Sequence, residues 1–336
     1  MRRHTLRMAH SLTKQCPDYV GSSGLTYAFH KLLQRRPETG SVWIAQAGGN
    51  KYILKDIPKS YYLNFTEDIW PRLRRSQHPN IRLPCDTVPN ERVLVYRYLS
   101  HDLLELARTS LDSQTRRRIL KSALQGLAEM HDHDIVHLDI KPDNFVVECQ
   151  TNELEGTTEI DTVQLTDFEN AVWLRPGKNV FGILAGNDNW RSPEAHLRAK
   201  LNKPADIFSF GAMCVYVMLG RMIFGRDEDF DYHESQGIEP GLIRLQRQTS
   251  YFGDEAGYRG LRRHFEDNGQ FCQLLDAMWE DRTASYIPYK HFSTWPEVED
   301  GDFRDVVLGL MSLDPGGRIT AREALRHPWF AELETE

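Results

Sequence analysis

Hydrophobic and polar positions change their period near residue 100 of the chain. Before that point, short apolar or alternating runs are separated by turn residues, which is typical of β-strands. Four strands are expected there, over residues 27–33, 42–45, 51–57 and 92–98. Residues 35–40 form a polar turn, and Gly48-Gly49-Asn50 predicts a tight hairpin. A helix is expected over residues 61–75, broken or kinked at Pro71 because proline lacks a backbone donor.

Beyond residue 100 the apolar positions recur with a helical period. In the segment 113–131 they fall at i, i+3 and i+4 spacing, which predicts one buried face. The positions of that face are Ile119, Leu120, Ala123, Leu124, Leu127 and Met130. Residues 206–219 are apolar almost all round, as in a helix buried within a lobe, and residues 320–327 predict a terminal helix ended by Pro328. The pattern favours an α+β molecule with a small β-rich lobe before a large helical lobe.

Composition and charge narrow the class of protein. The 336 residues are 40% hydrophobic and 26% charged, which is ordinary for a folded globular chain. The net charge of −7 argues against nucleic acid as a partner. Five cysteines with no close pair indicate neither a disulfide framework nor a zinc site, and fit a reducing intracellular compartment, cytoplasmic or nuclear. The longest apolar stretch, about ten residues, is half of what a bilayer requires, so no membrane span is expected.

The two ends of the chain differ in charge. The first seventeen residues carry Arg2, Arg3, Arg7 and Lys14 without an acidic residue. Such a segment is either a flexible N-terminal arm, the default interpretation, or a transit peptide. The last six residues, 331–336, are an acidic tail.

Two short motifs follow predicted strands and helices in a fixed order. The first is His-Leu-Asp-Ile-Lys-Pro-Asp-Asn at residues 137–144, between the helix 113–131 and a strand expected over 145–148. The second is Leu-Thr-Asp-Phe-Glu at residues 165–169, after a strand over 162–165. Together they resemble the H-R-D-x-K-x-x-N catalytic loop and the D-F-G metal loop of the eukaryotic protein kinase superfamily, Ser/Thr type.

The resemblance extends over about residues 27–330 and implies the bilobal protein-kinase-like fold. It divides the chain into an arm (1–24), a β-rich N-lobe (25–99) and a mainly α-helical C-lobe (100–330). An insert at about 222–300 lies within the C-lobe and is similar to that of the cyclin-dependent and MAP kinases. A docking surface for a partner and a solvated helical insert are equally compatible with its acidic, aromatic-rich sequence.

The resemblance implies a role for each ionic residue of the two motifs. Asp139 would accept or orient the substrate hydroxyl, and Lys141 would neutralise the transferring phosphate. Asn144 and Asp167 would supply oxygen ligands to Mg²⁺. The implied cofactors are therefore ATP and Mg²⁺.

Further positions are implied to bind the nucleotide. Lys55 occupies the strand position of the lysine that contacts the α/β-phosphates, and Gly40 and Val42 begin the G-x-V-x-x-A pattern that closes the glycine-rich loop. Glu67 is the candidate helix partner of Lys55, with Asp68 as the alternative.

The adenine ring would be received by the strand ending near residue 99. Tyr96 would be the gatekeeper, and backbone groups of Arg97 and Leu99 would bond the ring edge. Val42 and Val146 would cover the ring from either side, although both are equally compatible with plain core positions of a strand.

Other positions of the resemblance support the fold rather than the chemistry. Residues 186–194 resemble the end of an activation segment, in which Glu194 would pair with Arg318. Asp206 would hold the backbone of the catalytic loop. The run His131-Asp132-His133-Asp134 allows a metal site, but the entry to the catalytic loop explains it more simply.

Several residues depart from the family pattern. Arg35 and Pro37 replace the first two glycines of the phosphate loop, so backbone freedom is lost where phosphate should approach main-chain N–H groups. Glu169 replaces the last residue of D-F-G, and Asn187 replaces a threonine of the substrate-docking loop.

One pair of departures points to the mode of regulation. Leu138 replaces the arginine that reads a phosphorylated activation segment in many relatives, and residues 167–191 contain no Ser, Thr or Tyr. The sequence therefore predicts an activity that does not depend on activation-segment phosphorylation.

These features predict an intracellular protein serine/threonine kinase that transfers the γ-phosphate of Mg·ATP to a protein hydroxyl, with protein substrates as its partners. The damaged phosphate loop and Glu169 also allow a pseudokinase that acts as a nucleotide-binding or scaffold module. A small-molecule phosphotransferase is a third interpretation, disfavoured by the Ser192-Pro193-Glu194 pattern, which resembles that of peptide-accepting relatives.

Overall fold

The computed structural model describes residues 18–36, 40–152 and 157–331. Within them, the contacts divide the chain into two compact units. The first comprises residues 18–62 and 84–98, and the second comprises residues 63–83 and 99–331. No helix of the described residues is long and apolar enough to cross a membrane.

The first unit is built on a six-stranded sheet in which every neighbouring pair of strands is antiparallel. The strand order is β1-β2-β3-β4-β6-β5. The strands are β1 (Tyr19–Val20), β2 (Thr26–Arg36), β3 (Gly40–Ala47), β4 (Asn50–Asp56), β5 (Asp86–Thr87) and β6 (Val93–Arg97). One face buries a cluster that includes Tyr27, Trp43, Leu54 and Val95. The four strands expected from the sequence are confirmed.

The strands β2 and β3 are longer at their connection than the sequence predicted. Arg36 pairs with Gly40, so residues 37–39 connect the strands instead of the predicted turn of residues 35–40. Residues 37–39, which include Pro37, lie outside the described residues. Gly40 has φ +85°, and a Cβ there would lie 1.9 Å from the carbonyl oxygen of Asp56. Only glycine fits this position, because the neighbouring strand approaches too closely for any side chain.

The helical run expected at residues 61–75 is present but is not broken. It consists of α1 (Lys59–Leu63), a π-helical segment η1 (Asn64–Ile69) and α2 (Trp70–Leu73). Pro71 lies in the first turn of α2, and the backbone N–H of Trp70 donates to Phe65 O, five residues earlier. The wider π turn precedes the proline, so the chain accommodates Pro71 without ending the helix.

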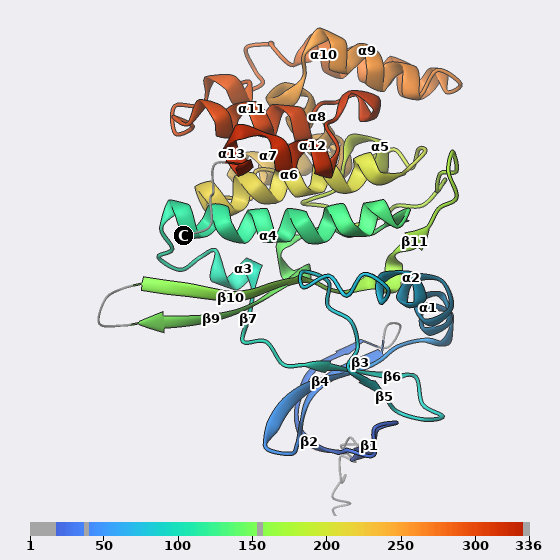
Figure 1. Ribbon diagram of the computed structural model, residues 1–336. Coiled ribbons are helices and arrows are strands. Elements are labelled where there is room, and N and C mark those ends of the chain that lie inside the picture. The colour runs from blue at the N-terminus through green and yellow to red at the C-terminus, as the bar shows by residue number, and fades with distance from the viewer. Residues whose placement is uncertain (1–17, 37–39, 153–156, 332–336) are drawn as a thin grey trace, which may run out of the picture. The chain divides into compact units, whose positions relative to one another are not determined.

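Helices make up most of the second unit (Figure 1). Besides α2, its α-helices are α3 (Leu103–Leu106), α4 (Ser113–Asp132), α5 (Pro193–His196), α6 (Lys203–Leu219), α7 (Glu228–Ser235), α8 (Pro240–Phe252), α9 (Glu255–His264), α10 (Gly269–Asp281), α11 (Gly301–Leu310), α12 (Ala321–Arg326) and α13 (Pro328–Ala331). Short 3₁₀ turns are η2 (Pro142–Asn144), η3 (Phe168–Asn170), η4 (Phe292–Thr294) and η5 (Pro315–Gly317). All six apolar positions expected on one face of α4 are buried, and α6 is buried almost throughout.

Small β-sheets in the second unit bring the two motifs together. Strands β9 (Phe145–Asn152) and β10 (Thr157–Leu165) form an antiparallel hairpin, beside which lies β7 (His101–Asp102). Because Phe145 pairs with Leu165, the residues just before β9 and just after β10 are neighbours. Strand β8 (Ile135–Val136), directly before the first motif, pairs with β11 (Val172–Trp173), which follows the second motif. The two motifs are therefore held together at both of their ends.

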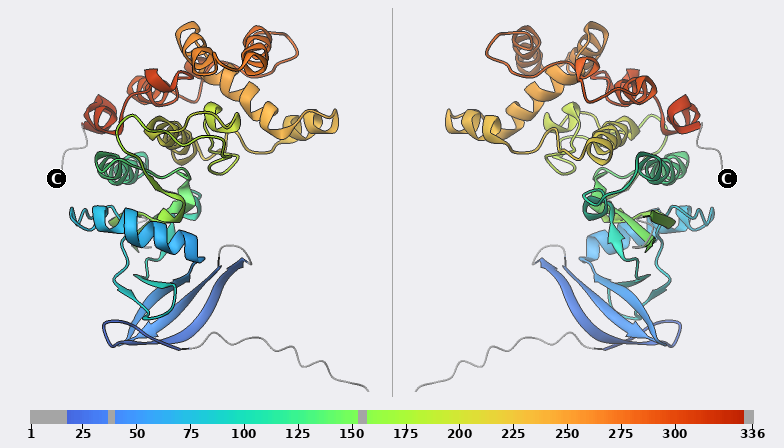
Figure 2. Two further views of the ribbon diagram at one scale, coloured as in Figure 1. Left: turned by 90° about the vertical axis from the view of Figure 1, so that its right-hand side faces the viewer. Right: turned by 90° about the vertical axis from the view of Figure 1, so that its left-hand side faces the viewer.

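The predicted insert at 222–300 is helical and contains α7 to α10 (Figure 2). The acidic residues at its start contact a buried arginine side chain. Arg247 is 1% exposed and donates to Asp227 (2.5 Å) and Asp229 (3.1 Å). At least this part of the insert is therefore packed rather than solvated. A docking role for the insert stays a prediction.

Candidate active site

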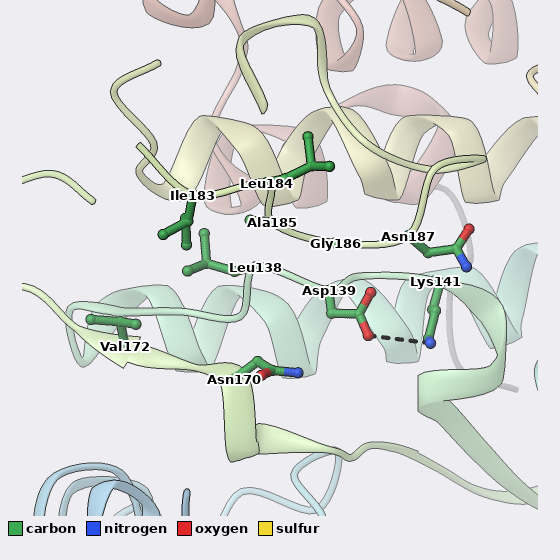
Figure 3. A pocket seen from close by; sticks show the side chains of 10 residues that line it. All are labelled: Leu138, Asp139, Lys141, Asn170, Val172, Ile183, Leu184, Ala185, Gly186 and Asn187. Carbon is green, nitrogen blue, oxygen red and sulfur yellow. Dashed lines mark ion pairs between the residues drawn. The ribbon is translucent and has the colours of Figure 1, made fainter. Parts of the chain in front are cut away.

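Asp139 and Lys141 lie together on the catalytic loop (Figure 3), and Asn144 of the same loop contacts Asp139. The Lys141 ammonium is 3.2 Å from Asp139 Oδ2. Asn144 donates from Nδ2 to the backbone oxygen of Asp139 (2.7 Å) and to its Oδ2 (3.3 Å). Lys141 and Asn144 thus both contact the Asp139 carboxylate and orient it.

Two carboxylates surround Lys141 and keep it charged. Its Nζ also lies 3.4 Å from Asp143 Oδ2, and the side chain is 15% exposed. Burial alone would lower the pKa of Lys141, but Asp139 and Asp143 outweigh it and raise the pKa above its ordinary value. A permanent cation therefore stands next to Asp139.

Asp206, at the start of α6, fixes the backbone of the catalytic loop. Its carboxylate accepts hydrogen bonds from the N–H groups of His137 (2.7 Å) and Leu138 (2.8 Å) and contacts His131 Nε2 at 3.0 Å. This is the contact expected from the sequence. It holds Leu138 at φ +65°, a left-handed conformation that costs free energy for any residue other than glycine.

His137 connects the catalytic loop to the metal loop. Its buried ring donates from Nε2 to Thr166 O (2.9 Å), while Nδ1 accepts from the backbone N–H of Asp139 (3.3 Å). The Thr166 N–H donates in turn to Asn144 O (2.9 Å). Hydrogen bonds therefore join the loop that carries Asp139 to the loop that carries Asp167.

The donor set at Asn144 and Asp167 fits Mg²⁺. Both side chains offer oxygen, the ligand type that Mg²⁺ prefers. The amide nitrogen of Asn144 is committed to Asp139, so its oxygen Oδ1 is the atom that the side chain can offer to a cation. Asp167 has φ +68°, directly before the 3₁₀ turn of Phe168–Asn170.

The metal loop packs against η1. Phe168 is buried and stacks on Phe65 at a ring separation of 6.4 Å. Asn64 donates from Nδ2 to Ala171 O (2.9 Å). Glu169, which replaces the family glycine, is buried in the same loop.

The nucleotide-binding residues expected from the sequence fall in both units. In the first unit, β3 and β4 place Val42 directly opposite Lys55, and β6 carries the buried Tyr96 and the exposed Arg97. Gly40 begins β3.

The second unit holds the remaining candidates for nucleotide binding. Leu99 follows the first unit directly, Val146 lies on β9, and Glu67 is exposed on η1, as is its alternative Asp68. Their contacts with ATP, and the pairing of Lys55 with Glu67 or Asp68, stay predictions.

An apolar cluster holds the activation segment beside the catalytic loop. Leu138 is 7% exposed and packs with other apolar residues of that loop, of the segment and of the chain after it. The cluster comprises Val136, Leu138, Val172, Leu174, Val180, Ala185, Ala195, Leu201 and Ala205. Val180 and Leu201 also exchange two backbone hydrogen bonds, of 3.0 and 2.8 Å. Apolar packing thus occupies the position where relatives place an arginine.

Arg191 is a structural residue of the site that the sequence reading missed. Its buried guanidinium donates to the carbonyl oxygens of Ala185 (2.6 Å) and Gly186 (2.5 Å) and to Asp188 (2.6 Å). Gln248, from α8 of the insert, donates to Arg191 O (2.7 Å). No sequence signal links residues 57 positions apart, so only the fold reveals this contact.

Two further expectations concern the scaffold of the second unit. The pairing of Glu194 with Arg318 is confirmed, with two buried hydrogen bonds of 2.6 and 2.9 Å. The alternative of a metal at residues 131–134 finds no support, because His131 contacts Asp206, His133 contacts Glu129, and Asp134 accepts from Lys203. Within the described residues, no group of three or more His, Cys, Asp or Glu side chains is arranged to hold a metal ion.

The chain is similar to known proteins in sequence and in fold. Residues 44–330 match the family model described as the protein kinase domain. The chain is 25% identical over 272 residues to the cell division control protein 2 homolog 3 of Trypanosoma brucei brucei, covering 77% of this chain and 76% of that protein. It is also 25% identical over 240 residues to the serine/threonine-protein kinase AFC2 of Arabidopsis thaliana, covering 64% of this chain and 52% of that protein.

A longer relative and a solved structure complete the comparison. Identity to the serine/threonine-protein kinase/endoribonuclease ire-1 of Caenorhabditis elegans is 31% over 330 residues, which cover 93% of this chain but 28% of that protein. The crystal structure of the yeast RNA Pol II CTD kinase CTDK-1 complex superimposes with a TM-score of 0.69 at 16% identity, covering 92% of this chain and 94% of that one. At such identity the structural match supports the bilobal α+β fold alone. With the family model matching most of its length, the chain belongs to the eukaryotic protein kinase superfamily.

Proposed function

We propose that the chain is an active protein serine/threonine kinase that transfers the γ-phosphate of Mg·ATP to a protein hydroxyl. The proposal is carried by contacts within the catalytic loop, in which Lys141 Nζ and Asn144 Nδ2 lie 3.2 and 3.3 Å from Asp139 Oδ2. The pairing of Phe145 with Leu165 brings the loop that carries Asp167 beside this group. Phosphoryl transfer depends on positioning and charge neutralisation more than on covalent help from the protein. These four residues supply both.

Each residue has a distinct role in the proposed reaction. Asp139 accepts a hydrogen bond from the substrate hydroxyl and directs its oxygen, while Lys141 offsets charge on the phosphate. Asn144 and Asp167 hold Mg²⁺, which when bound neutralises the phosphate oxygens. Lys55 contacts the α- and β-phosphates, and Glu67 or Asp68 orients Lys55.

We further propose that activity does not require phosphorylation of the activation segment. The Leu138 cluster and the Val180–Leu201 hydrogen bonds support this, because they fasten the segment without an added charge. Exhaustive phosphatase treatment should therefore leave kcat/KM unchanged within twofold. A loss of activity traced by mass spectrometry to a phosphate within residues 167–194 would contradict the proposal.

The primary test is transfer of labelled γ-phosphate from Mg·ATP to a serine- and threonine-containing peptide library. Asp139→Asn should lower kcat by at least about a hundredfold, because the substrate hydroxyl loses its acceptor. Asp132→Asn is the matched control, since Asp132 is half exposed and pairs with Arg322 away from the reacting groups. It should retain the wild-type rate.

The outcomes separate the candidate functions. Transfer lost in Asp139→Asn but kept in Asp132→Asn supports the kinase. Mg²⁺-dependent ATP binding by the folded wild type without transfer would favour a pseudokinase, for which buried Glu169 in the metal loop would be the first suspected cause. Phosphorylation of a metabolite but of no peptide would favour a small-molecule phosphotransferase.

A further inference from the structure

A cavity in the second unit lies apart from the proposed catalytic residues, where α4 packs against α6 and α12 (Figure 1). Its volume is about 220 Å³, which is room for a small organic molecule rather than for a single water. Ala128, His131 and Asp132 line it, so the cavity lies at the end of α4 that leads toward the catalytic loop. Neither Asp139 nor Lys141 belongs to its wall.

Most of the cavity wall is apolar. Ile207 comes from α6, Ile319 lies just before α12, and Ala321 begins α12. Ala128 and Ala321 are buried, and their short side chains leave open the space that larger residues would fill. A ligand with an apolar body therefore gains free energy when it and this wall are removed from water.

The charged side chains of the wall are mainly cations. Lys203 and Arg322 line the cavity with side chains that are 35% and 45% exposed. Their partners are Asp134, which is not part of the wall, and Asp132, which is the only carboxylate among the described residues of that wall. Arg318 adds a third cation. The wall is thus positive on a chain whose net charge is −7, so it attracts an anion.

Two residues of the wall connect the cavity to the scaffold of the catalytic loop. His131 Nε2 lies 3.0 Å from Asp206, whose carboxylate accepts hydrogen bonds from the N–H groups of residues 137 and 138. Arg318 holds Glu194 after the activation segment through a 2.6 Å hydrogen bond. A molecule that packs against His131 therefore opposes any opening of the structure that separates His131 from Asp206.

We infer that this cavity is a binding site for a small carboxylate with an apolar body. The body lies over Ile207 and Ile319, and the carboxylate faces Lys203 and Arg322. A single negative charge is the best match, because Asp134 and Asp132 already neutralise part of the two cations. The inference goes beyond the proposed kinase function and does not depend on it.

The test measures binding of three probes to the full chain by isothermal titration calorimetry at low ionic strength. 3-Phenylpropionate should bind with a Kd below about 1 mM. 3-Phenylpropionamide has the same shape without the charge and should bind about fivefold more weakly, since two partly exposed ion pairs contribute about that factor. Acetate, which has the charge without the apolar body, should not saturate. Equal affinity for acid and amide, or no saturable binding of the acid up to about 10 mM, would overturn the inference.

A double variant assigns the charge preference to the cavity. Lys203→Gln with Arg322→Gln should weaken binding of the acid about fivefold and leave binding of the amide unchanged. Lys200→Gln with Arg326→Gln is the matched control, because it removes the same net charge from two exposed residues outside the wall. It should bind both probes like wild type. Acid binding that survives the first double variant would place the site elsewhere and overturn the inference.

A second variant tests the apolar part of the wall. Ile319→Asn should weaken binding of both the acid and the amide by about tenfold, because it removes apolar surface that either probe covers. Full affinity of this variant for both probes, in a chain that still unfolds cooperatively, would contradict the assignment of the apolar body.

Hydrogen exchange tests the position of the ligand beside His131. With 3-phenylpropionate at ten times its Kd, exchange of the amides of residues 137 and 138 should slow by about tenfold, because the ligand must leave before this region opens. Unchanged exchange at these amides despite saturable binding would overturn the placement. A chain that binds the acid but transfers no phosphate refutes only the kinase proposal, and an active kinase that does not bind the acid refutes only this inference.

Discussion

Leu138 combines an unfavourable backbone conformation with a buried apolar side chain. Its φ of +65° is imposed by the bonds to Asp206, and its side chain is enclosed by the activation segment. Restoring the family arginine by Leu138→Arg would place a guanidinium in this cluster without an anion. We expect it to lower the free energy of unfolding by about 3 kcal/mol or more.

Leu138→Met is the matched control, because it keeps the volume, the apolarity and the same cost of positive φ. It should lower the free energy of unfolding by less than about 1.5 kcal/mol. Urea denaturation followed by circular dichroism measures both variants. Equal stabilities for the Arg and Met variants would show that the cluster is open to solvent and does not fasten the segment.

The buried pair of Glu194 and Arg318 predicts a dependence of stability on pH. Burial alone would raise the pKa of Glu194, but the Arg318 guanidinium outweighs it and holds the pKa below the ordinary 4.5. A carboxyl whose folded-state pKa is depressed stabilises the fold above pH 4.5 and loses that contribution as the pH falls through its folded-state value. Glu194→Gln should cost about 3–5 kcal/mol at pH 7, because the buried guanidinium loses its anion.

Urea titrations at pH 7, 5 and 3.5 test this expectation. The deficit of Glu194→Gln relative to wild type should shrink at the lowest pH, because there the Glu194 carboxyl of the unfolded wild-type chain takes up a proton. Glu297→Gln serves as the comparison, since Glu297 pairs with Arg221 at 2.5 Å but both are about half exposed. It should cost less than about 1 kcal/mol at every pH.

At the scale of elements, η1 and α2 are held against the start of the activation segment. The Arg72 guanidinium lies 3.8 Å from the ring centre of Trp173, and Asn64 donates to Ala171 O. A cation–π contact of this kind contributes about 0.5–2 kcal/mol. Trp173→Leu should therefore raise amide hydrogen exchange in residues 64–73 by about two- to thirtyfold.

Trp279→Leu provides the control for this element. Trp279 carries Arg282 over its ring at 3.3 Å, but on α10, within the insert. Its removal should speed exchange within α10 and leave residues 64–73 unchanged. Equal exchange in residues 64–73 of wild type and Trp173→Leu would show that the stacking of Phe65 on Phe168 and the hydrogen bond of Asn64 hold the helix without the Arg72 contact.

Sequence pattern predicted those elements whose signal is local. The strands β2 to β4 and β6 and the helices α4 and α6 follow from alternation or helical period, and the catalytic loop follows from fixed spacing. The π turn before Pro71 was not predicted, because the pattern of apolar positions does not distinguish i→i+5 from i→i+4 bonding. The four-residue helices α5 and α13 are too short for any period to emerge.

The features that the sequence did not reveal depend on contacts between distant residues. The apolar cluster of the activation segment requires Val136, Leu138 and Leu201 to meet, although they span more than sixty positions. The support of Arg191 by Gln248 depends likewise on the packing of α8. The spacing of residues predicts the catalytic loop because its members are close in the sequence. It does not predict which distant segments of the chain pack against that loop.

At the scale of the whole molecule, the residues proposed to bind the nucleotide are divided between the two compact units. Lys55 belongs to the first unit, and Asn144 and Asp167 belong to the second. A ligand that binds only the folded chain stabilises it by RT ln(1 + [L]/Kd), about 2.7 kcal/mol at a hundredfold excess over Kd. Mg·ATP should therefore raise the melting temperature by several degrees, and EDTA should reduce that shift by removing Mg²⁺.

Variants in the two units should change this shift differently. Asp167→Asn should abolish the part that depends on Mg²⁺ and leave the shift measured in EDTA unchanged, because it removes only a metal ligand. Lys55→Ala should reduce the shift with and without Mg²⁺, because it removes a phosphate contact. Lys51→Ala, at the exposed start of the same strand, should match wild type. If Lys55→Ala kept the full shift, the lysine would not contact the phosphates, and the assignment of β4 to the nucleotide site would have to be abandoned.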